Sequence, residues 1–539
     1  MKKIIFIPIF FICISSYSQD VKGAKKLLYY KKFQTAEKLL HQVLKSDPHN
    51  DEAWFLLTET YCSQEAKDNI LDSLRAAPGE IKTEPYYLAA MGMALLQQSG
   101  ISEAERYFSQ ALEKTKYKRP EILLAIARAK VIAEKGDANQ AIDLLTKAIK
   151  KDKNNAELYT ELGKAYRKLH NGTEAFKAFG QAINADKQSA EPYYLTGMIF
   201  RTQNNSDLYL EYFDKAITAD PNYAPAYYQL YFHYYFRNVN TAKGYLEKYI
   251  ALSDHNIQND YDYADILYLT KNYKEAIAHA NRLIETQKDK TPARIYKLIA
   301  YSYHESNDHD ISFDFMLHYF DKAPDSVLIA KDFILLAELY HEKQKIDSAI
   351  FFYTVGAELE PDKNSVTKYY KTLAELSRQQ KDYAGMAHWL GKYYNANEKS
   401  TNVDLFNWGI AWFQSGNFQK SDSVFGIYSE KYPDQDFGYY WRARSSAAID
   451  SSMEQGLAVP HYLKVVEIGE ADTTMKSKKH LVESYGYLAG YEANQNKNYE
   501  AAIEYFEKLL QLDPDNEQAK KYVKILKETM AKKEALTDS

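Results

Sequence analysis

Apolar, aromatic and small side chains return at a fixed interval along almost the whole chain. Alanines recur at related offsets, and those at 141 and 175 lie 34 residues apart. In the clearest copy of the pattern the recurring positions are Tyr159, Leu162, Gly163, Tyr166, Ala175, Phe179 and Ala182. Spacings of three and four residues place such side chains on one face of an α-helix. Each interval therefore predicts two consecutive amphipathic helices, and the sequence predicts an all-α chain.

Further copies of this pattern begin near Trp54, Tyr193, Phe333 and Trp408, and the last copy ends at Pro514. The pattern resembles the tetratricopeptide repeat (TPR) family. The repeat of that family has a large aromatic residue, Leu, Gly and Tyr on its first helix, then Ala, Phe and Ala on its second, and a closing Pro. The resemblance implies a right-handed α-solenoid of about 14 helix-turn-helix repeats. We assign the array to residues 19–516 and a capping helix with a short tail to residues 517–539.

Each position of the repeat has a mechanical role. Small residues such as Gly163 and Ala175 are expected where the two helices of a hairpin cross, because a larger side chain would separate the backbones there. Aromatic residues at repeat positions 4, 11 and 24 are expected to fill the space between one hairpin and the next. Since a single hairpin cannot bury its own apolar face, stability depends on the stacking of neighbours.

The repeat pattern is interrupted in three places. It is poorly matched between Cys62 and Thr83, and a polar loop stretches it between Ser446 and Thr474. It is also one residue short between Tyr234 and Ala242. Irregularities of this kind usually map to loops at one edge of a solenoid, where they either carry function or are simply tolerated.

The amino terminus has the pattern of a secretory signal peptide. Lys2 and Lys3 precede an apolar run that ends at Ile14, and small residues precede a cleavage site between Ser18 and Gln19. The apolar run is shorter than the roughly 20 residues that span a bilayer, so an uncleaved anchor is the weaker alternative. We therefore assign residues 1–18 to a signal peptide and expect a periplasmic protein with no transmembrane segment after cleavage.

A lipid anchor on Cys13 is a second and unfavoured alternative for the amino terminus. It would require small residues before the cysteine, where Phe11 and Ile12 stand. Removal of the signal peptide would leave Cys62 as the sole cysteine of the chain, so no intrachain disulfide could form. Packing alone must then stabilise the fold.

The composition limits the classes of partner. The formal net charge of −5 on 539 residues is too small for a general phosphate-binding surface, so we expect no nucleic acid partner. Tyrosine is unusually frequent, with 48 residues. A large part of these rings is required by the repeat itself, and the second members of doublets such as Tyr227-Tyr228 turn about 100° away along the helix.

Catalytic and metal-binding signatures are missing from the sequence. His304 and Glu305 are followed by His309, which is one position too far for the HExxH zinc motif. The sequence contains no nucleophile elbow, Walker A loop or dinucleotide fingerprint. We therefore expect a protein that is not an enzyme and has no cofactor or metal site; a hidden hydrolase is a remote alternative.

The resemblance implies a concave groove lined by the first helix of each repeat. In the TPR family, positions 2, 5, 9 and 12 tend to face this groove, which gives a Tyr-rich stretch with basic side chains on either side. The candidate partner-binding residues are Lys164, Arg167, Tyr194, Arg201, Tyr228, Phe232, Tyr235, Tyr261, Tyr268, Lys297 and Tyr301. Tyrosine gives a large contact area, and Arg and Lys can bind carboxylates. The alternative is that some of these rings only pack between neighbouring helices.

The sequence thus favours a protein-protein interaction scaffold or adaptor of the bacterial cell envelope. Its expected partners are envelope proteins or peptide segments, among them TonB-type energy-transducing or secretion and assembly machinery, which some Gram-negative envelope proteins with TPRs accompany. The alternative is a module that binds glycan or peptidoglycan, because exposed rings also stack on sugars. The sequence leaves the partner, the pathway and the oligomeric state open.

Overall fold

The computed structural model of the chain describes residues 21–64, 70–472 and 476–537, with side chains as far as residue 533. Within these ranges the protein has 29 α-helices, no strand and 79% helix, which confirms the predicted all-α solenoid. The predicted signal peptide, its cleavage site and Cys13 lie outside the described residues. No described helix combines the length and the apolar character that crossing a bilayer requires.

The chain divides into two compact units, and the division falls within the helix α17. The first unit contains the described residues up to Thr291 together with Tyr301–Ser306, and the second contains Pro292–Ala300 and the residues from Asn307 onward. The helices of the first unit are α1 (Val21–Tyr29), α2 (Phe33–Ser46), α3 (Asp51–Ser63), α4 (Ile70–Arg75), the 3-10 turn η1 (Gly79–Thr83), α5 (Pro85–Gln97), α6 (Ile101–Lys114), α7 (Pro120–Ile132), α8 (Ala138–Ile149), α9 (Ala156–Lys168), α10 (Gly172–Ala185), α11 (Ala190–Thr202), α12 (Ser206–Ala219), α13 (Ala224–Tyr234), α14 (Val239–Leu252), α15 (Ile257–Leu269), α16 (Tyr273–Gln287) and the short turn η2 (Lys288–Lys290).

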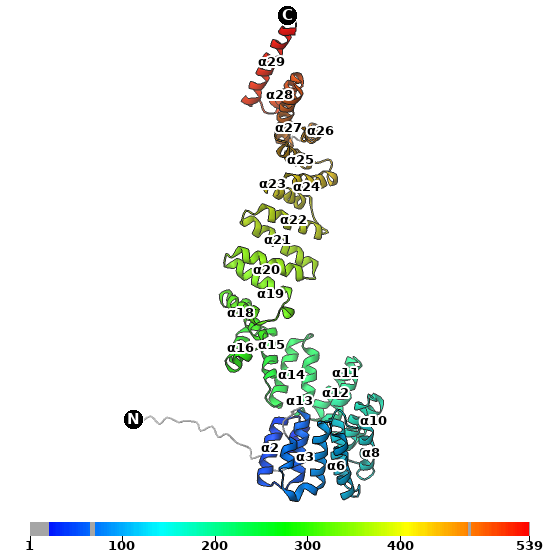
Figure 1. Cartoon of the computed structure of the whole chain (residues 1–539). Helices are drawn as coiled ribbons and strands as arrows, with labels where there is room; N and C mark the ends of the chain where they lie inside the picture. Colours follow the sequence, from blue (N-terminus) through cyan, green and yellow to red (C-terminus); the bar gives the residue numbers. More distant parts are fainter. Residues whose placement is uncertain (1–20, 65–69, 473–475, 538–539) are drawn as a thin grey trace, which may run out of the picture. The chain divides into compact units, whose positions relative to one another are not determined.

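The remaining helices are α17 (Ala293–Glu305), α18 (His309–Lys322), the turn η3 (Asp325–Val327), α19 (Ala330–Glu342), α20 (Ile346–Leu359), α21 (Lys363–Gln379), α22 (Tyr383–Ala396), α23 (Asn402–Gln414), α24 (Phe418–Lys431), α25 (Asp436–Ile449), α26 (Val459–Ala471), α27 (Lys478–Tyr491), the π-helical turn η4 (Glu492–Asn496), α28 (Tyr499–Leu512) and α29 (Glu517–Thr537). Consecutive helices pair into hairpins, which stack along each unit (Figure 1). The last helix, α29, packs against α28.

Glycines on the first helix of a hairpin allow close contact with an aromatic ring on the second. A Cβ atom added to Gly163 would lie 2.2 Å from the ring of Phe179, which is far inside van der Waals contact. The same added atom at Gly197 would lie 2.6 Å from the ring of Phe213. Only glycine fits at these crossing points, as the repeat pattern predicts.

Asparagine and aspartate side chains cap the start of four second helices in the first unit. Asp137, Asn171, Asn205 and Asn238 each accept hydrogen bonds from the backbone N–H groups of the helix that follows. These caps satisfy donors that an α-helix leaves without an internal partner. Helix α2 differs, since Lys32 at its N-cap position provides no such bond.

The first unit closes on itself. Residues at and beside the turn between α1 and α2 contact the start of α11, Asp220 between α12 and α13, and Asp254 in the loop that follows α14. In Figure 1 the blue helices at the start of the chain accordingly lie beside the green α13 and α14. The stack of hairpins therefore completes one turn and meets its own beginning.

The irregular segments of the sequence correspond to short helices and long loops. Helix α4 has six residues and is followed by η1, while residues 65–69 lie outside the described part. In the loop between α25 and α26, the carboxylate of Asp450 accepts backbone hydrogen bonds from Gln455 and Leu457. Cys62 is buried, and this burial raises the pKa of its thiol to about 12, which makes it unreactive near neutral pH.

Candidate binding surfaces

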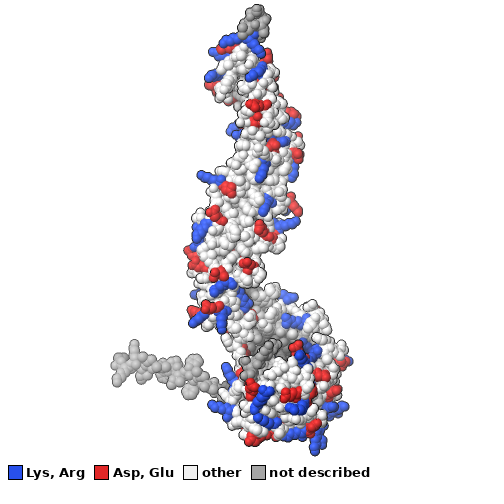
Figure 2. All heavy atoms as spheres, in the orientation of Figure 1, with Lys and Arg blue, Asp and Glu red and all other residues white. Residues whose placement is uncertain are grey.

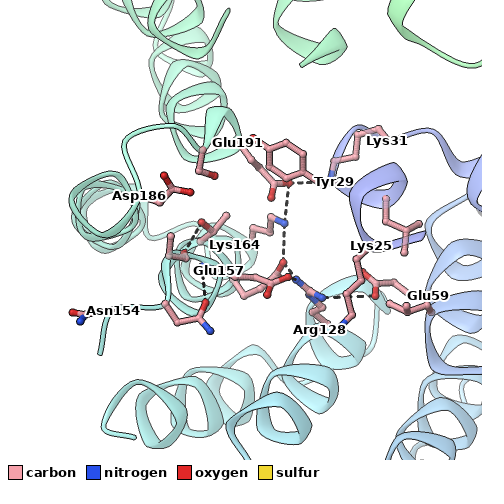
Figure 3. Close-up of a pocket in the computed structure, with 17 residues that line it drawn as sticks. Lys25, Tyr29, Lys31, Glu59, Arg128, Asn154, Glu157, Lys164, Asp186 and Glu191 are labelled. Atoms are coloured by element: carbon pink, nitrogen blue, oxygen red, sulfur yellow. Dashed lines mark hydrogen bonds and ion pairs between the residues drawn. The ribbon is translucent and has the colours of Figure 1, made fainter. Parts of the chain in front are cut away.

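A polar cavity of about 460 Å³ lies inside the closed first unit (Figure 3). Its walls come from the first helices of several hairpins and from the α1–α2 turn, and we call it the central cavity. Figure 2 shows a hollow in this part of the surface, with basic and acidic side chains alternating around it. The cavity therefore has mixed charge rather than one dominant sign.

Ion pairs link the walls of the central cavity. Arg128 on α7 contacts Glu157 on α9, lies 3.2 Å from Glu161 on the same helix and 3.9 Å from Glu59 on α3. Lys164 continues the chain of contacts, 2.8 Å from Glu161, and reaches α11 at Glu191. These pairs join four first helices across the hollow.

Glu191 connects this network to the beginning of the chain. Its carboxylate lies 3.0 Å from the ammonium of Lys164 and 2.8 Å from that of Lys31 in the α1–α2 turn. Burial opposes the charge of Glu191, but the two ammonium groups outweigh it and hold the pKa of the carboxyl well below its usual range. Lys164 thus lines the central cavity, on the first-helix face where the sequence predicts it, and its ammonium is paired with Glu161 and Glu191. That it binds a partner stays a prediction.

Three further contacts close the ring. The backbone N–H of Ala190 donates to the hydroxyl of Tyr29 at 2.7 Å, and the hydroxyl of Tyr30 donates to Asp220 at 2.9 Å. Burial and the neighbouring Asp220 raise the pKa of Tyr30 to about 12, which keeps this donor protonated. The third contact is made by Asp254, in the loop after α14.

Asp254 caps helix α2 from the opposite end of the ring. Its carboxylate accepts from the backbone N–H groups of Gln34 at 2.7 Å and Thr35 at 3.2 Å, and from the Thr35 hydroxyl at 2.5 Å. A carboxylate at a helix N-terminus satisfies unpaired donors and interacts favourably with the helix dipole. The cap that α2 lacks locally is therefore supplied from 219 residues away.

A second candidate site is formed by exposed rings at the end of α13, which we call the α13 surface. Its members are Arg201, Tyr228, Phe232, Tyr235 and Phe236. Phe236 is 88% exposed and Phe232 is 47% exposed, so two large apolar rings in this segment face solvent. Isolated exposed apolar residues are common, but a cluster of exposed aromatic rings indicates a binding surface.

The rings of the α13 surface form two pairs, which the buried ring of Tyr231 connects through Phe232 at 5.5 Å and Tyr235 at 5.7 Å. Phe232 packs edge-on against Tyr228 with centroids 4.9 Å apart, and Tyr235 packs edge-on against Phe236 at 4.7 Å. The guanidinium of Arg201, from α11, lies 5.8 Å from the centroid of Phe232. The structure thus brings together four residues of the predicted groove and fixes their rings by mutual packing.

Tyr228 contributes to the α13 surface mainly by packing against other rings and only partly by facing solvent. Its ring is half-buried and lies 4.6 Å from the ring of Tyr249 on α14. Burial, with a smaller effect of Asp262, raises the pKa of Tyr228 to about 12. Phe232 and Phe236 are therefore the residues that a partner would contact most directly.

Other predicted groove residues belong to the packing between helices. Tyr261 and Tyr301 are 7% and 6% exposed, so the prediction that they face a partner is wrong. Tyr268 is half-buried, with its ring 5.7 Å from that of Tyr273. Lys297 lies 2.7 Å from the fully buried Asp332, which commits its charge to a structural ion pair in the second unit. Neighbouring first helices pack so closely here that the inner-facing rings become core.

The last two predicted groove residues are Tyr194 and Arg167. Tyr194 is half-buried, and its ring packs at 5.6 Å from Tyr223 and 5.9 Å from Phe213. Arg167 is half-buried and lines a shallow recess together with His170 and Thr202. Neither residue joins the exposed rings of α13.

Sequence reasoning missed Phe236, the residue most exposed in the α13 surface. It follows α13 in the turn where the repeat is one residue short, and that irregularity was the signal available for it. The charges of the central cavity, including Arg128 and Glu191, carried no comparable signal. Their significance depends on ring closure, which the repeat pattern does not encode.

Within the described residues, no group of three or more His, Cys, Asp or Glu side chains is placed to hold a metal ion.

Comparisons with known proteins identify the repeats in both units. One tetratricopeptide repeat model matches residues 133–199, and a second matches residues 190–223 and 487–516. No curated protein matches the chain.

Several solved structures are similar to the chain over part of its length. The C-terminal part of a TPR repeat-containing protein from Cytophaga hutchinsonii is 26% identical over 49% of this chain and 98% of its own, with a TM-score of 0.29. A tetratricopeptide repeat protein from Parabacteroides merdae is 17% identical over 46% and 96%, with a TM-score of 0.28. A protective antigen of uropathogenic Escherichia coli with an SLR fold is 15% identical over 85% and 97%, with a TM-score of 0.40.

These TM-scores are all below 0.5, so the likenesses carry no argument about function. The matched repeat models identify the hairpins within residues 133–223 and 487–516 as tetratricopeptide repeats. Tetratricopeptide repeats are present in both compact units, and repeats of this type generally mediate protein-protein interaction.

Proposed function

We propose that the protein is a non-enzymatic scaffold of the bacterial cell envelope that binds a partner protein through the α13 surface. The observation that carries this proposal is the exposure of Phe232 and Phe236, with Arg201 over the ring of Phe232, on an array of repeats that generally bind proteins. Large rings and arginine dominate the energetics of protein interfaces. The rings are also held in place by their neighbours, so they lose little entropy when a partner binds.

The envelope location rests on the amino-terminal sequence, which has the features of a secretory signal peptide. We propose that the mature protein begins at Gln19 and resides in the periplasm. Partners of the TonB-type or secretion class belong to the same proposal. Fractionation of cells and sequencing of the mature amino terminus test this part independently of binding.

Glycan binding through the same rings is the competing function. Sugars stack on flat aromatic faces, whereas the rings of Phe232 and Tyr228 meet edge to face and leave no continuous flat platform. This geometry favours a protein partner with side chains that fit between the rings. Titration with muropeptides compared with capture of envelope proteins separates the two functions.

The direct test is a double variant, Phe232→Ala with Phe236→Ala. Because both side chains are exposed and lie outside the helix crossings, we expect unchanged helical content and a melting temperature within a few degrees of the parent. We expect capture of the envelope partner to fall at least tenfold, since hot-spot rings typically contribute about 2 kcal/mol or more each.

Phe351→Ala provides the matched control, because Phe351 on α20 is also strongly exposed but lies outside the α13 surface. This control should retain capture. Equal capture by the parent, the double variant and the control would exclude the α13 surface as the partner site. A muropeptide that binds the parent and competes at these rings would favour the glycan function instead.

A further inference from the structure

Arg167 on α9 carries a half-buried charge that the described chain leaves unpaired. It lines a shallow recess of about 470 Å³ between the α9–α10 turn and the last turn of α11. Within the described residues its guanidinium forms no hydrogen bond and no ion pair. Burial lowers the pKa of this group, and no described carboxylate lies near enough to oppose that effect. Because a charge held partly out of water is costly without a counter-charge, the recess is suited to an anion.

The described residues that line this recess supply hydrogen-bond donors and include no acidic side chain. Besides Arg167, the polar residues of the lining are His170, Thr173, Thr202 and Gln203. The hydroxyl of Thr173 and the side-chain amide of Gln203 are without a partner in the part of the chain that the structure describes. An oxyanion in the recess would therefore meet neutral donors as well as the guanidinium.

The cations of the central cavity differ from Arg167 because all of them have acidic partners. An ion pair is formed by each of the four that line this cavity, Lys25, Lys31, Arg128 and Lys164. The pairs of Arg128 and Lys164 are drawn as dashed lines in Figure 3. Lys164 lies only three residues before Arg167 on the same helix. The missing counter-charge is therefore a local property of the Arg167 recess.

Arg201 is a second arginine without an acidic partner, and it connects the recess to the α13 surface. It follows Arg167 by 34 residues, which is one repeat, and its guanidinium lies 5.8 Å from the centroid of the Phe232 ring. Burial raises the pKa of Tyr194, and the positive charges of Arg167 and Arg201 both oppose this effect, so both act on the same hydroxyl. Glu191 also acts on Tyr194, but its carboxylate is committed to the ion pairs described above. Two like charges thus meet around one hydroxyl.

We infer that a carboxylate of the partner segment on the α13 surface, an aspartate or glutamate side chain, docks between Arg167 and Arg201. This inference rests on the proposed function, because Arg201 belongs to the α13 surface. A guanidinium presents paired N–H donors that match the two oxygens of a carboxylate, and a carboxylate here supplies the counter-charge that the chain lacks. The partner segment is therefore acidic next to its apolar contact with Phe232.

Photo-crosslinking in living cells locates the partner segment. A photo-reactive amino acid is placed at position 203, in the recess, and at position 236, in separate full-length chains. We expect the same envelope protein in both adducts. Mass spectrometry of the adduct from position 203 should place an aspartate or a glutamate within a few residues of the crosslinked site.

Arg167→Gln and Arg201→Gln test the two charges. We expect each substitution to reduce capture of this envelope protein at least tenfold and to leave the melting temperature within a few degrees of the parent, since neither arginine is paired within the described chain. Arg106→Gln is the matched control, because it removes the same charge from an exposed site on α6, where Arg106 lies 3.6 Å from Glu103. The control should retain capture.

A double-mutant cycle tests the contact itself. It combines Arg167→Gln with the change of the acidic partner residue to its amide. If the two groups are in contact, the combined loss of affinity should be close to the loss from either change alone, whereas independent sites give losses that multiply.

Losses that multiply, a crosslinked segment without an acidic residue, or unchanged capture by Arg167→Gln would overturn this inference alone when position 236 still yields its adduct. The absence of an adduct at position 236 would overturn the proposed function and this inference together. If Arg167→Gln fails to fold, the same cycle with Arg201→Gln decides the outcome.

Discussion

Phe236 is almost wholly exposed, whereas Tyr261 and Tyr301 are core residues, although all three belong to the aromatic-rich middle of the chain. The repeat pattern predicts which positions are aromatic and which helix face they occupy. It does not predict how closely neighbouring first helices approach, and this approach decides whether an inner-facing ring is exposed. The repeat pattern therefore predicts which positions carry aromatic residues, but it does not predict whether their rings are exposed.

The glycines at helix crossings give the sharpest prediction at this scale. Gly163→Ala places a Cβ atom against the Phe179 ring, and we expect it to lower the free energy of unfolding by roughly 1–3 kcal/mol. Gly180→Ala, on the second helix of the same hairpin, meets open space and should raise it by up to about 1 kcal/mol. Denaturant unfolding followed by circular dichroism measures both, and equal effects of the two substitutions would contradict the assigned register.

At the scale of elements, the sequence indicates some helix caps and gives no sign of others. The sequence indicates local caps wherever Asn or Asp precedes a second helix, as at Asn171 and Asn205. It gives no indication for α2, whose cap is Asp254. A contact between residues so distant follows from the curvature of the stacked hairpins, which is a property of many small packing angles and not of any motif.

Removal of this distant cap should open the beginning of the ring. We expect Asp254→Ala to destabilise α2 by about 0.5–2 kcal/mol, the usual range for loss of an N-cap. Faster hydrogen exchange at the amides of Gln34 and Thr35 measures the effect. Asp143→Ala on α8 is the control, since Asp143 is exposed and caps no helix. Identical exchange in the two variants would show that Asp254 does not hold α2.

At the scale of the whole molecule, the all-α solenoid followed from the sequence because each hairpin repeats the same packing. The division into two units and the closure of the first did not, since both depend on contacts between repeats far apart in the chain. Lys164 illustrates the difference. It lines the concave side of the first helices, as the repeat pattern predicts, but closure of the ring pairs it with Glu191 of a distant hairpin in an ion-pair network.

Ring closure should depend on pH through Glu191. Because its pKa is lowered in the folded protein, the stabilisation it gives is complete above the unfolded value of about 4.3 and is lost as the pH falls below that value. We expect Glu191→Gln to melt at a lower temperature than the parent at pH 7, and the difference to shrink toward pH 3. A difference that stays constant with pH would mean that the charge of Glu191 does not hold the ring together.

The central claim is that a partner protein sits on the α13 surface in the cell envelope. The most direct measurement places a photo-crosslinking amino acid at position 236 in living cells, with position 351 as the control. We predict a discrete covalent adduct with an envelope protein at position 236 and none at position 351. No adduct at position 236, or the same adducts at both positions, would contradict the claim.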